Sequence, residues 1–147
     1  MLKGQDRVVF IDYEYCSVNF PFYDISNYFD ETRLDYDVYE PPYFGFIPPR
    51  EDEQEMRVRF IDFYNICWDF PKEEVKVRFE ELRKLPKYVE RRNKMLEDLV
   101  VGRLLCSLMW GWWAIIVSKN PHISFDYLKF AKMRYDNYLD SKKRILK

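Results

Sequence analysis

The sequence predicts a mainly α-helical protein with a single strand near its N-terminus. Apolar residues recur at helical spacing through most of the chain after residue 24. Prolines fall where helices would begin or end. Only residues 7–13 have the compact apolar run expected of a strand. The chain has 147 residues, of which 48% are hydrophobic and 19% aromatic, which is enough for one modest domain with a packed core.

The predicted strand, residues 7–13, leads through four apolar residues, Val8 to Ile11, to the carboxylate of Asp12. No other segment makes a convincing partner strand, so we interpret this strand as a remnant of a larger sheet or hairpin. A helix is expected over residues 24–36, with Asp24 as its N-cap. Residues 39–49 contain four prolines and one glycine, which predicts a loop.

Two amphipathic or charged helices are expected next. Residues 72–85 form a charged, exposed helix that follows Pro71 and ends before Pro86. Residues 51–67 begin with acidic residues, as helices prefer, and bring five apolar residues to one face: Met56, Phe60, Phe63, Tyr64 and Cys67.

The last two predicted helices cover residues 89–117 and 124–143, with Ser124 as the N-cap of the second. The first of them changes along its length from charged to apolar. Arg103 interrupts its apolar part, which leaves 14 uncharged residues from 104 to 117. A run of that length is more typical of a buried core helix than of a membrane span, so no transmembrane segment is expected.

Composition narrows the classes of function. The net charge is −1 with no block of like charges, which disfavours nucleic-acid binding because phosphate contacts require a basic face. The three cysteines, Cys16, Cys67 and Cys106, are an odd number without close pairing, so we expect reduced, mostly buried thiols in a cytoplasmic protein. The N-terminus lacks an apolar stretch of signal-peptide length.

Two features indicate chemistry, and each has a simpler explanation. Asp12 ends a predicted strand, where metal–phosphate sites are often built, but an acid after a strand is also a common turn cap. Trp110 and Trp113 lie three apart and therefore on one face of a helix. Two tryptophans on one face can line a binding site, although such a pair in an apolar helix is more commonly part of the core.

Three segments together resemble the choline/ethanolamine kinase family. Residues 105–113 contain a Trp-Gly-x-Trp core, and the last predicted helix follows the family from residue 124 to Tyr138. The first segment is the longest and most specific, and it reads Val9-Phe10-Ile11-Asp12-Tyr13-Glu14-Tyr15 and continues through Asn19, Asp24, Ile25, Asn27 and Phe29 to Glu31. The resemblance is weakest over residues 39–92.

The resemblance implies a fold and an activity. The fold would be the C-terminal helical part of a protein-kinase-like, or aminoglycoside-phosphotransferase-like, structure, with residues 1–147 as a single partial domain. The activity would be ATP-dependent phosphorylation of the hydroxyl of choline or ethanolamine, the first step of the CDP-choline route to phospholipids, with Mg²⁺ and ATP as cofactor and co-substrate. The nucleotide-binding lobe and a catalytic loop of the H-x-D-x-x-x-x-N type are absent from the sequence.

Site residues also follow from the resemblance. Asp12 would bind the metal, with Glu14 beside it, and no catalytic base would come from this chain. A phenylalanine, Phe130, stands where choline kinases have tyrosine. The amine would be held by aromatic rings and one anionic wall, formed by Tyr15, Glu31, Tyr36, Trp110, Trp113 and Phe130.

An alternative remains open at this point. The chain would then be a shortened, non-catalytic relative that binds amines or a protein partner. Neither the choice between choline and ethanolamine nor the oligomeric state follows from the residues, and a homodimer is compatible with them.

Overall fold

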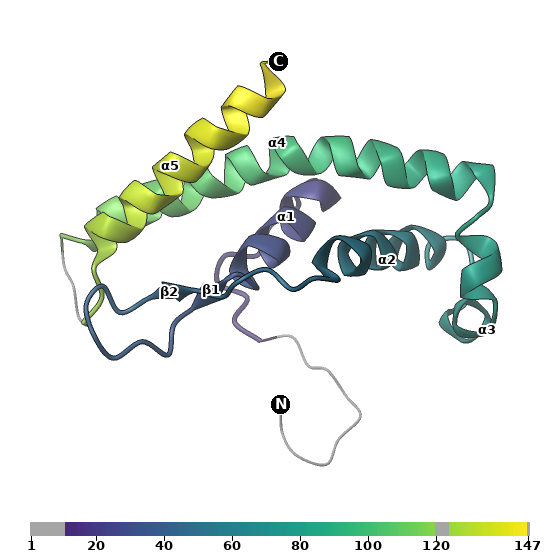
Figure 1. Ribbon diagram of the computed structural model, residues 1–147, viewed down its shortest axis with the longest axis horizontal. Coiled ribbons are helices and arrows are strands. Elements are labelled where there is room, and N and C mark those ends of the chain that lie inside the picture. Colours follow the sequence, from purple (N-terminus) through teal and green to yellow (C-terminus); the bar gives the residue numbers. More distant parts are fainter. Residues whose placement is uncertain (1–10, 120–123, 147) are drawn as a thin grey trace, which may run out of the picture.

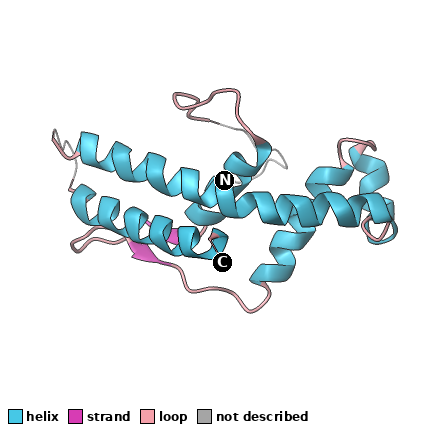
Figure 2. Cartoon of the chain, turned by 90° about the horizontal axis from the view of Figure 1, so that it is seen from above, coloured by secondary structure: helices cyan, strands magenta, loops and turns pink. Residues whose placement is uncertain are grey.

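The computed structural model describes residues 11–119 and 124–146 and confirms a mainly helical chain. Its longest element is α4 (Pro86–Val117), a helix of 32 residues against which three other helices pack (Figure 1). Helix α5 (Tyr127–Ile145) lies along the C-terminal half of α4, as the view from above also shows (Figure 2). Helix α4 therefore provides the surface on which α1, α2 and α5 pack.

Three shorter helices complete the described part of the chain. Helices α1 (Pro21–Glu31) and α2 (Glu53–Ile66) both contact α4, and α3 (Lys72–Leu82) contacts α2 near the start of α4 (Figure 1). Their order agrees with the sequence prediction, while several of their bounds differ from it.

Helix α1 corrects one of those predictions. It begins at Pro21 rather than at residue 25, because the fixed φ of proline suits the first turn of a helix. Asp24 therefore lies in the first turn and does not cap the helix. The helix ends at Glu31 rather than at residue 36. The hydroxyl of Thr32 donates to the Phe29 carbonyl oxygen at 2.9 Å, and the chain then turns into a strand.

A small antiparallel sheet was missing from the prediction. Strand β1 (Leu34–Asp35) pairs with β2 (Gly45–Phe46), with Leu34 opposite Phe46. Two-residue strands are too short to leave an alternating pattern in the sequence. Of the strand predicted over residues 7–13, residues 11–13 are not in a strand, and residues 7–10 lie outside the described part of the chain.

Helix α5 begins at a different cap from the one predicted. The Asp126 carboxylate accepts a hydrogen bond from the backbone N–H of Lys129 at 2.9 Å, so Asp126 rather than Ser124 is the N-cap. The backbone N–H of Asp126 donates to the Pro42 carbonyl oxygen at 3.1 Å. This bond ties the β1–β2 connection to the start of α5.

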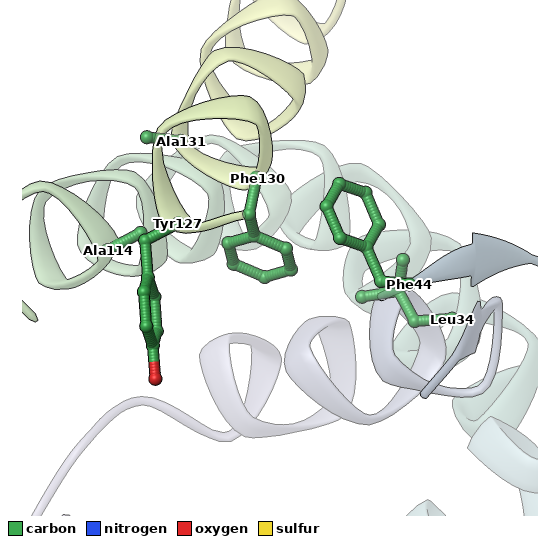
Figure 3. Packing of buried hydrophobic residues seen from close by; sticks show 6 residues of the cluster. All are labelled: Leu34, Phe44, Ala114, Tyr127, Phe130 and Ala131. Carbon is green, nitrogen blue, oxygen red and sulfur yellow. The ribbon is translucent and has the colours of Figure 1, made fainter. Parts of the chain in front are cut away.

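Buried apolar residues form three clusters along α4. The first lies between the sheet, the end of α4 and the start of α5, where Phe130 and Phe44 meet edge to face at 5.4 Å (Figure 3). The second joins α2, α3 and the start of α4 through Ile66, Val75, Leu82 and Tyr88. The third packs α1 on α2 and the middle of α4 through Ile25, Phe29 and Ile61.

Two glycines of α4 differ in what surrounds them. A Cβ on Gly102 would lie 2.4 Å from Ser26 Oγ and 2.6 Å from the Phe22 carbonyl oxygen, so glycine is needed there for α1 to approach. A Cβ on Gly111 would meet its nearest atoms, in Arg134 and Ala131, at 3.6 and 3.8 Å. Those are ordinary contacts, so packing does not require glycine at 111.

A buried carboxylate joins three helices at the far end of the fold. Asp62 is fully buried and accepts hydrogen bonds from Arg83 at 2.9 Å and from Arg92 at 3.0 Å. The charge is therefore compensated, as a buried carboxylate requires. Nothing in the hydrophobic pattern had marked this residue.

The cysteines are free thiols, as expected, but they are not mostly buried. Cys16 is exposed and Cys67 half-buried, and only Cys106 is buried. The Cys106 thiol contacts the Tyr23 carbonyl oxygen at 3.3 Å. Burial raises its pKa to about 12, so this thiol stays protonated at neutral pH.

Among the described residues, α4 alone has the length and apolar composition of a membrane-crossing helix. This is weak evidence, because core helices of soluble proteins share both properties. The absence of a membrane span stays a prediction.

Candidate functional site: an aromatic cavity

A cavity of about 620 Å³ opens where four parts of the chain meet. They are the end of α1, the β1–β2 connection, the C-terminal part of α4 and the start of α5. Most of its lining is aromatic, with rings from Tyr36, Tyr39, Tyr43, Trp110, Trp113, Phe125, Tyr127 and Phe130. Segments up to about a hundred residues apart in sequence thus form one aromatic wall.

The two tryptophans lie on the cavity side of α4, as their spacing predicts. Their ring centroids are 5.5 Å apart in an edge-to-face arrangement, and Trp113 makes a similar contact with Tyr127 at 5.8 Å. The Trp110 indole N–H donates to the Asn27 side-chain oxygen at 2.6 Å, which ties α4 to α1. Trp112 is 66% exposed and does not line the cavity.

Tyr15 is placed differently from the other aromatic residues of the predicted amine site. It is not part of the cavity lining. Its hydroxyl accepts a hydrogen bond from the Trp113 indole N–H at 3.0 Å, and its ring meets the edge of Trp110 at 6.1 Å. The structure therefore brings Tyr15 to the tryptophan pair, where it can orient Trp113.

Glu31, the acid predicted to form the anionic wall of the amine site, lines the cavity and already has two partners within the chain. One of its oxygens accepts a hydrogen bond from the Tyr36 hydroxyl at 2.8 Å, and the other is paired with the guanidinium of Arg134. Burial and the nearby Glu31 carboxylate raise the pKa of Tyr36, so its phenol stays protonated and donates.

Four lining residues on α5 or just before it were not predicted for the site: Ser124, Phe125, Tyr127 and Arg134. Arg134 is only 1% exposed, and its guanidinium carbon lies 4.8 Å from the centre of the Phe130 ring. Phe130, Tyr127 and Arg134 are spaced by three and four residues, so helical periodicity starting from Phe130 could have found the other two.

The two acids predicted to bind a metal, Asp12 and Glu14, lie in the segment before α1 and are both exposed. Asp12 has a φ of 67°, which is uncommon for a residue other than glycine. In the described ranges, no group of three or more ligating side chains comes together. Their carboxylates have the oxygen chemistry that Mg²⁺ prefers, as one or two ligands completed by phosphates and water.

The aromatic lining of the cavity can hold a quaternary ammonium group. A quaternary ammonium has no N–H donor, so it is held by ring faces, each contributing about 0.5–2 kcal/mol depending on how well water is excluded.

Comparison with known proteins identifies the family. Residues 1–139 match the model for choline/ethanolamine kinase. The chain belongs to the choline/ethanolamine kinase family. It is 28% identical over 152 residues to choline kinase alpha of Mus musculus, and that alignment covers 99% of this chain. It is 31% identical over 144 residues to the choline/ethanolamine kinase of Homo sapiens, with 95% of the chain covered.

The family includes relatives named for either amine. The probable ethanolamine kinase A of Dictyostelium discoideum is 31% identical over 145 residues and covers 97% of the chain. These alignments cover 31%, 33% and 34% of the three relatives, so the chain spans about a third of their length. The sequence prediction of the family is thereby confirmed.

Proposed function

We propose that this chain is the C-terminal, amine-binding part of an ATP-dependent choline/ethanolamine kinase with a protein-kinase-like fold. The enzyme would transfer the γ-phosphoryl group of ATP to the hydroxyl of choline or ethanolamine, the first step toward the corresponding phospholipid. The observation that carries the proposal is the aromatic cavity. Five of the six residues assigned to the amine by family resemblance line it, and the sixth, Tyr15, contacts the tryptophan pair.

The residues of the site fall into two groups in this proposal: rings that contact the ammonium group, and polar side chains that orient those rings. Trp110, Trp113, Tyr36 and Phe130 surround the ammonium group with ring faces and exclude water from it. Asn27 and Tyr15 fix the two indoles through the hydrogen bonds described above.

Of the groups needed for phosphoryl transfer, this chain would supply a metal ligand but not the catalytic base. Asp12 would hold Mg²⁺, which neutralises charge on the nucleotide phosphates when it is bound. The printed sequence has no H-x-D-x-x-x-x-N segment, so the base that accepts the hydroxyl proton must come from outside these residues. The second candidate, an amine-binding relative without turnover, would use the same aromatic cavity. Formation of phosphocholine from choline and MgATP, assayed with the protein expressed from the complete open reading frame that encodes this chain, distinguishes the two.

The amine site is tested by calorimetric titration of the chain with choline chloride. Trp113→Ala removes a cavity ring and should weaken binding by about 2- to 30-fold, the equivalent of the 0.5–2 kcal/mol of one ring face. Trp112→Ala is the matched control, because it removes the same side chain from the exposed side of the same helix. Its affinity should stay within about twofold of the wild type. Equal losses in the two variants would show that these tryptophans serve only packing.

A further inference from the structure

The amine cavity contains a cation of its own. Arg134 lines the cavity, is almost fully buried, and stacks its guanidinium over the Phe130 ring at 4.8 Å. Because a buried guanidinium needs a counter-charge, its pairing with Glu31 is the contact that allows it to stay there. One face of Phe130 is thus already occupied by a cation of the chain itself.

The two acids at the end of α1, Asp30 and Glu31, are each paired with an arginine. Glu31 accepts a hydrogen bond on each of its two oxygens, from Arg134 and from Tyr36. Its neighbour Asp30 is paired with Arg103 of α4 at 3.2 Å. Each of the two carboxylates that end α1 therefore has its own arginine.

These pairings affect the two candidate amines differently. A primary ammonium is strongly hydrated and carries three N–H donors, so entering the cavity costs free energy unless acceptors replace its water. Each Glu31 oxygen already accepts one hydrogen bond, so a primary ammonium would compete with Arg134 and Tyr36 for this carboxylate. A trimethylammonium has no donor and is attracted by ring faces, which the cavity offers in abundance.

We propose that the cavity selects a quaternary ammonium over a primary one, and that Arg134 sets this selectivity by neutralising Glu31. The inference rests on the proposed function, since it concerns the amine bound at the same site. It makes Arg134 a specificity-determining residue rather than a catalytic one.

The test compares the Kd values of choline and ethanolamine in calorimetric titrations at pH 7. The wild-type chain should bind choline at least about tenfold more tightly than ethanolamine. In Arg134→Met, a neutral side chain of similar length, Glu31 is freed for N–H donors. This ratio should fall at least about fivefold, mainly through tighter ethanolamine binding. Arg134→Lys keeps the positive charge, so its ratio should stay within about twofold of the wild type.

A loss of folding is controlled by a paired variant. Arg134→Met/Glu31→Gln removes both charges and leaves no unpaired carboxylate, so it should fold and keep the preference for choline. Circular dichroism checks each variant before titration. Tighter binding of ethanolamine by the wild type would overturn the inference, as would an unchanged ratio in folded Arg134→Met or a lost preference in the paired variant.

The failure of this inference is distinguishable from that of the proposed function. If neither amine binds the wild-type chain, the amine site itself is refuted, and the inference with it. If choline binds no more tightly than its uncharged carbon analogue 3,3-dimethylbutan-1-ol, the site does not recognise the cation, and both proposals are refuted. If the amines bind and only the responses to the Arg134 variants differ from expectation, the proposed function stands and the role of Arg134 is refuted.

Discussion

The contact between α1 and α4 at Gly102 provides a sharp test of the packing. In Gly102→Ala, the new methyl group would lie 2.6 Å from the Phe22 carbonyl oxygen and 2.4 Å from Ser26 Oγ. Both are roughly 1 Å shorter than a normal contact of about 3.5 Å. The Phe22 oxygen belongs to the backbone, and Ser26 donates to the Leu99 carbonyl oxygen at 3.0 Å. Relief therefore requires α1 to move or a hydrogen bond to break.

Gly111→Ala in the same helix is the matched control, because its Cβ would make only ordinary contacts. Both changes improve helix propensity by about 1 kcal/mol. Overpacking of a close helix contact costs about 1–3 kcal/mol, and two overlaps at Gly102 place that cost near 3. We expect Gly102→Ala to be about 2 kcal/mol less stable than the wild type and Gly111→Ala about 1 kcal/mol more stable. The difference of about 3 kcal/mol is the cost of the overlap alone, because the propensity gain cancels.

The assay is urea unfolding followed by circular dichroism and tryptophan fluorescence. Equal slopes of free energy against urea are needed for the two variants, so that their midpoints report stability. Two variants of equal stability would refute the reasoning, because the close approach of α1 to α4 could not then exist in solution.

Two further predictions concern buried polar groups. Asp62→Ala should lower the free energy of unfolding by about 3–5 kcal/mol because it strands two largely buried arginines, whereas Asp69→Ala, at a more exposed carboxylate, should lower it less. Equal losses on urea unfolding would contradict this. Burial holds the pKa of the Cys106 thiol at about 12 in the folded chain, while the unfolded thiol loses its proton near the ordinary cysteine pKa of 9.0. The stability of the wild type should therefore fall as the pH rises from 9 to 11, by up to about 1.4 kcal/mol per pH unit more than that of Cys106→Ala. A stability difference that does not change with pH would count against the buried, neutral thiol.

The helices could be predicted because their signals are local. Helical spacing of apolar residues in α2 and α5 is a property of neighbouring residues. The starts of α1 and α4 were predicted a few residues too late, because Pro21 and Pro86 each stand in the first turn. The sheet was not predictable, since two-residue strands have no period and their pairing depends on a connection of nine residues between Asp35 and Gly45. The cap of α5 was missed by two positions, because Ser124 and Asp126 are both good N-cap residues.

The candidate site was predictable in part, for a similar reason. Family resemblance and helical period together placed Trp110 and Trp113 on one face, and the structure sets both in the cavity wall. The partner of Glu31 could not be found in this way. Arg134 lies 103 residues further along the chain, and an arginine in a charged helix looks like a surface residue until packing buries it.

The length of α4 separates the aromatic cavity at its C-terminal end from the α2–α3 cluster at its N-terminal end. At 32 residues the helix is about 48 Å long, and the cluster that joins it to α2 and α3 contains no residue of the cavity lining. Substitutions, insertions or a remodelled surface at that end therefore leave the geometry of the aromatic cavity intact, provided that α4 stays straight and folded. Residues 39–92, where the sequence is expected to resemble the family least, contain α2, α3 and the start of α4, together with β2 and two residues of the cavity lining, Tyr39 and Tyr43. The end of the molecule formed by α2 and α3 can therefore diverge and acquire contacts particular to this protein while the aromatic cavity is kept.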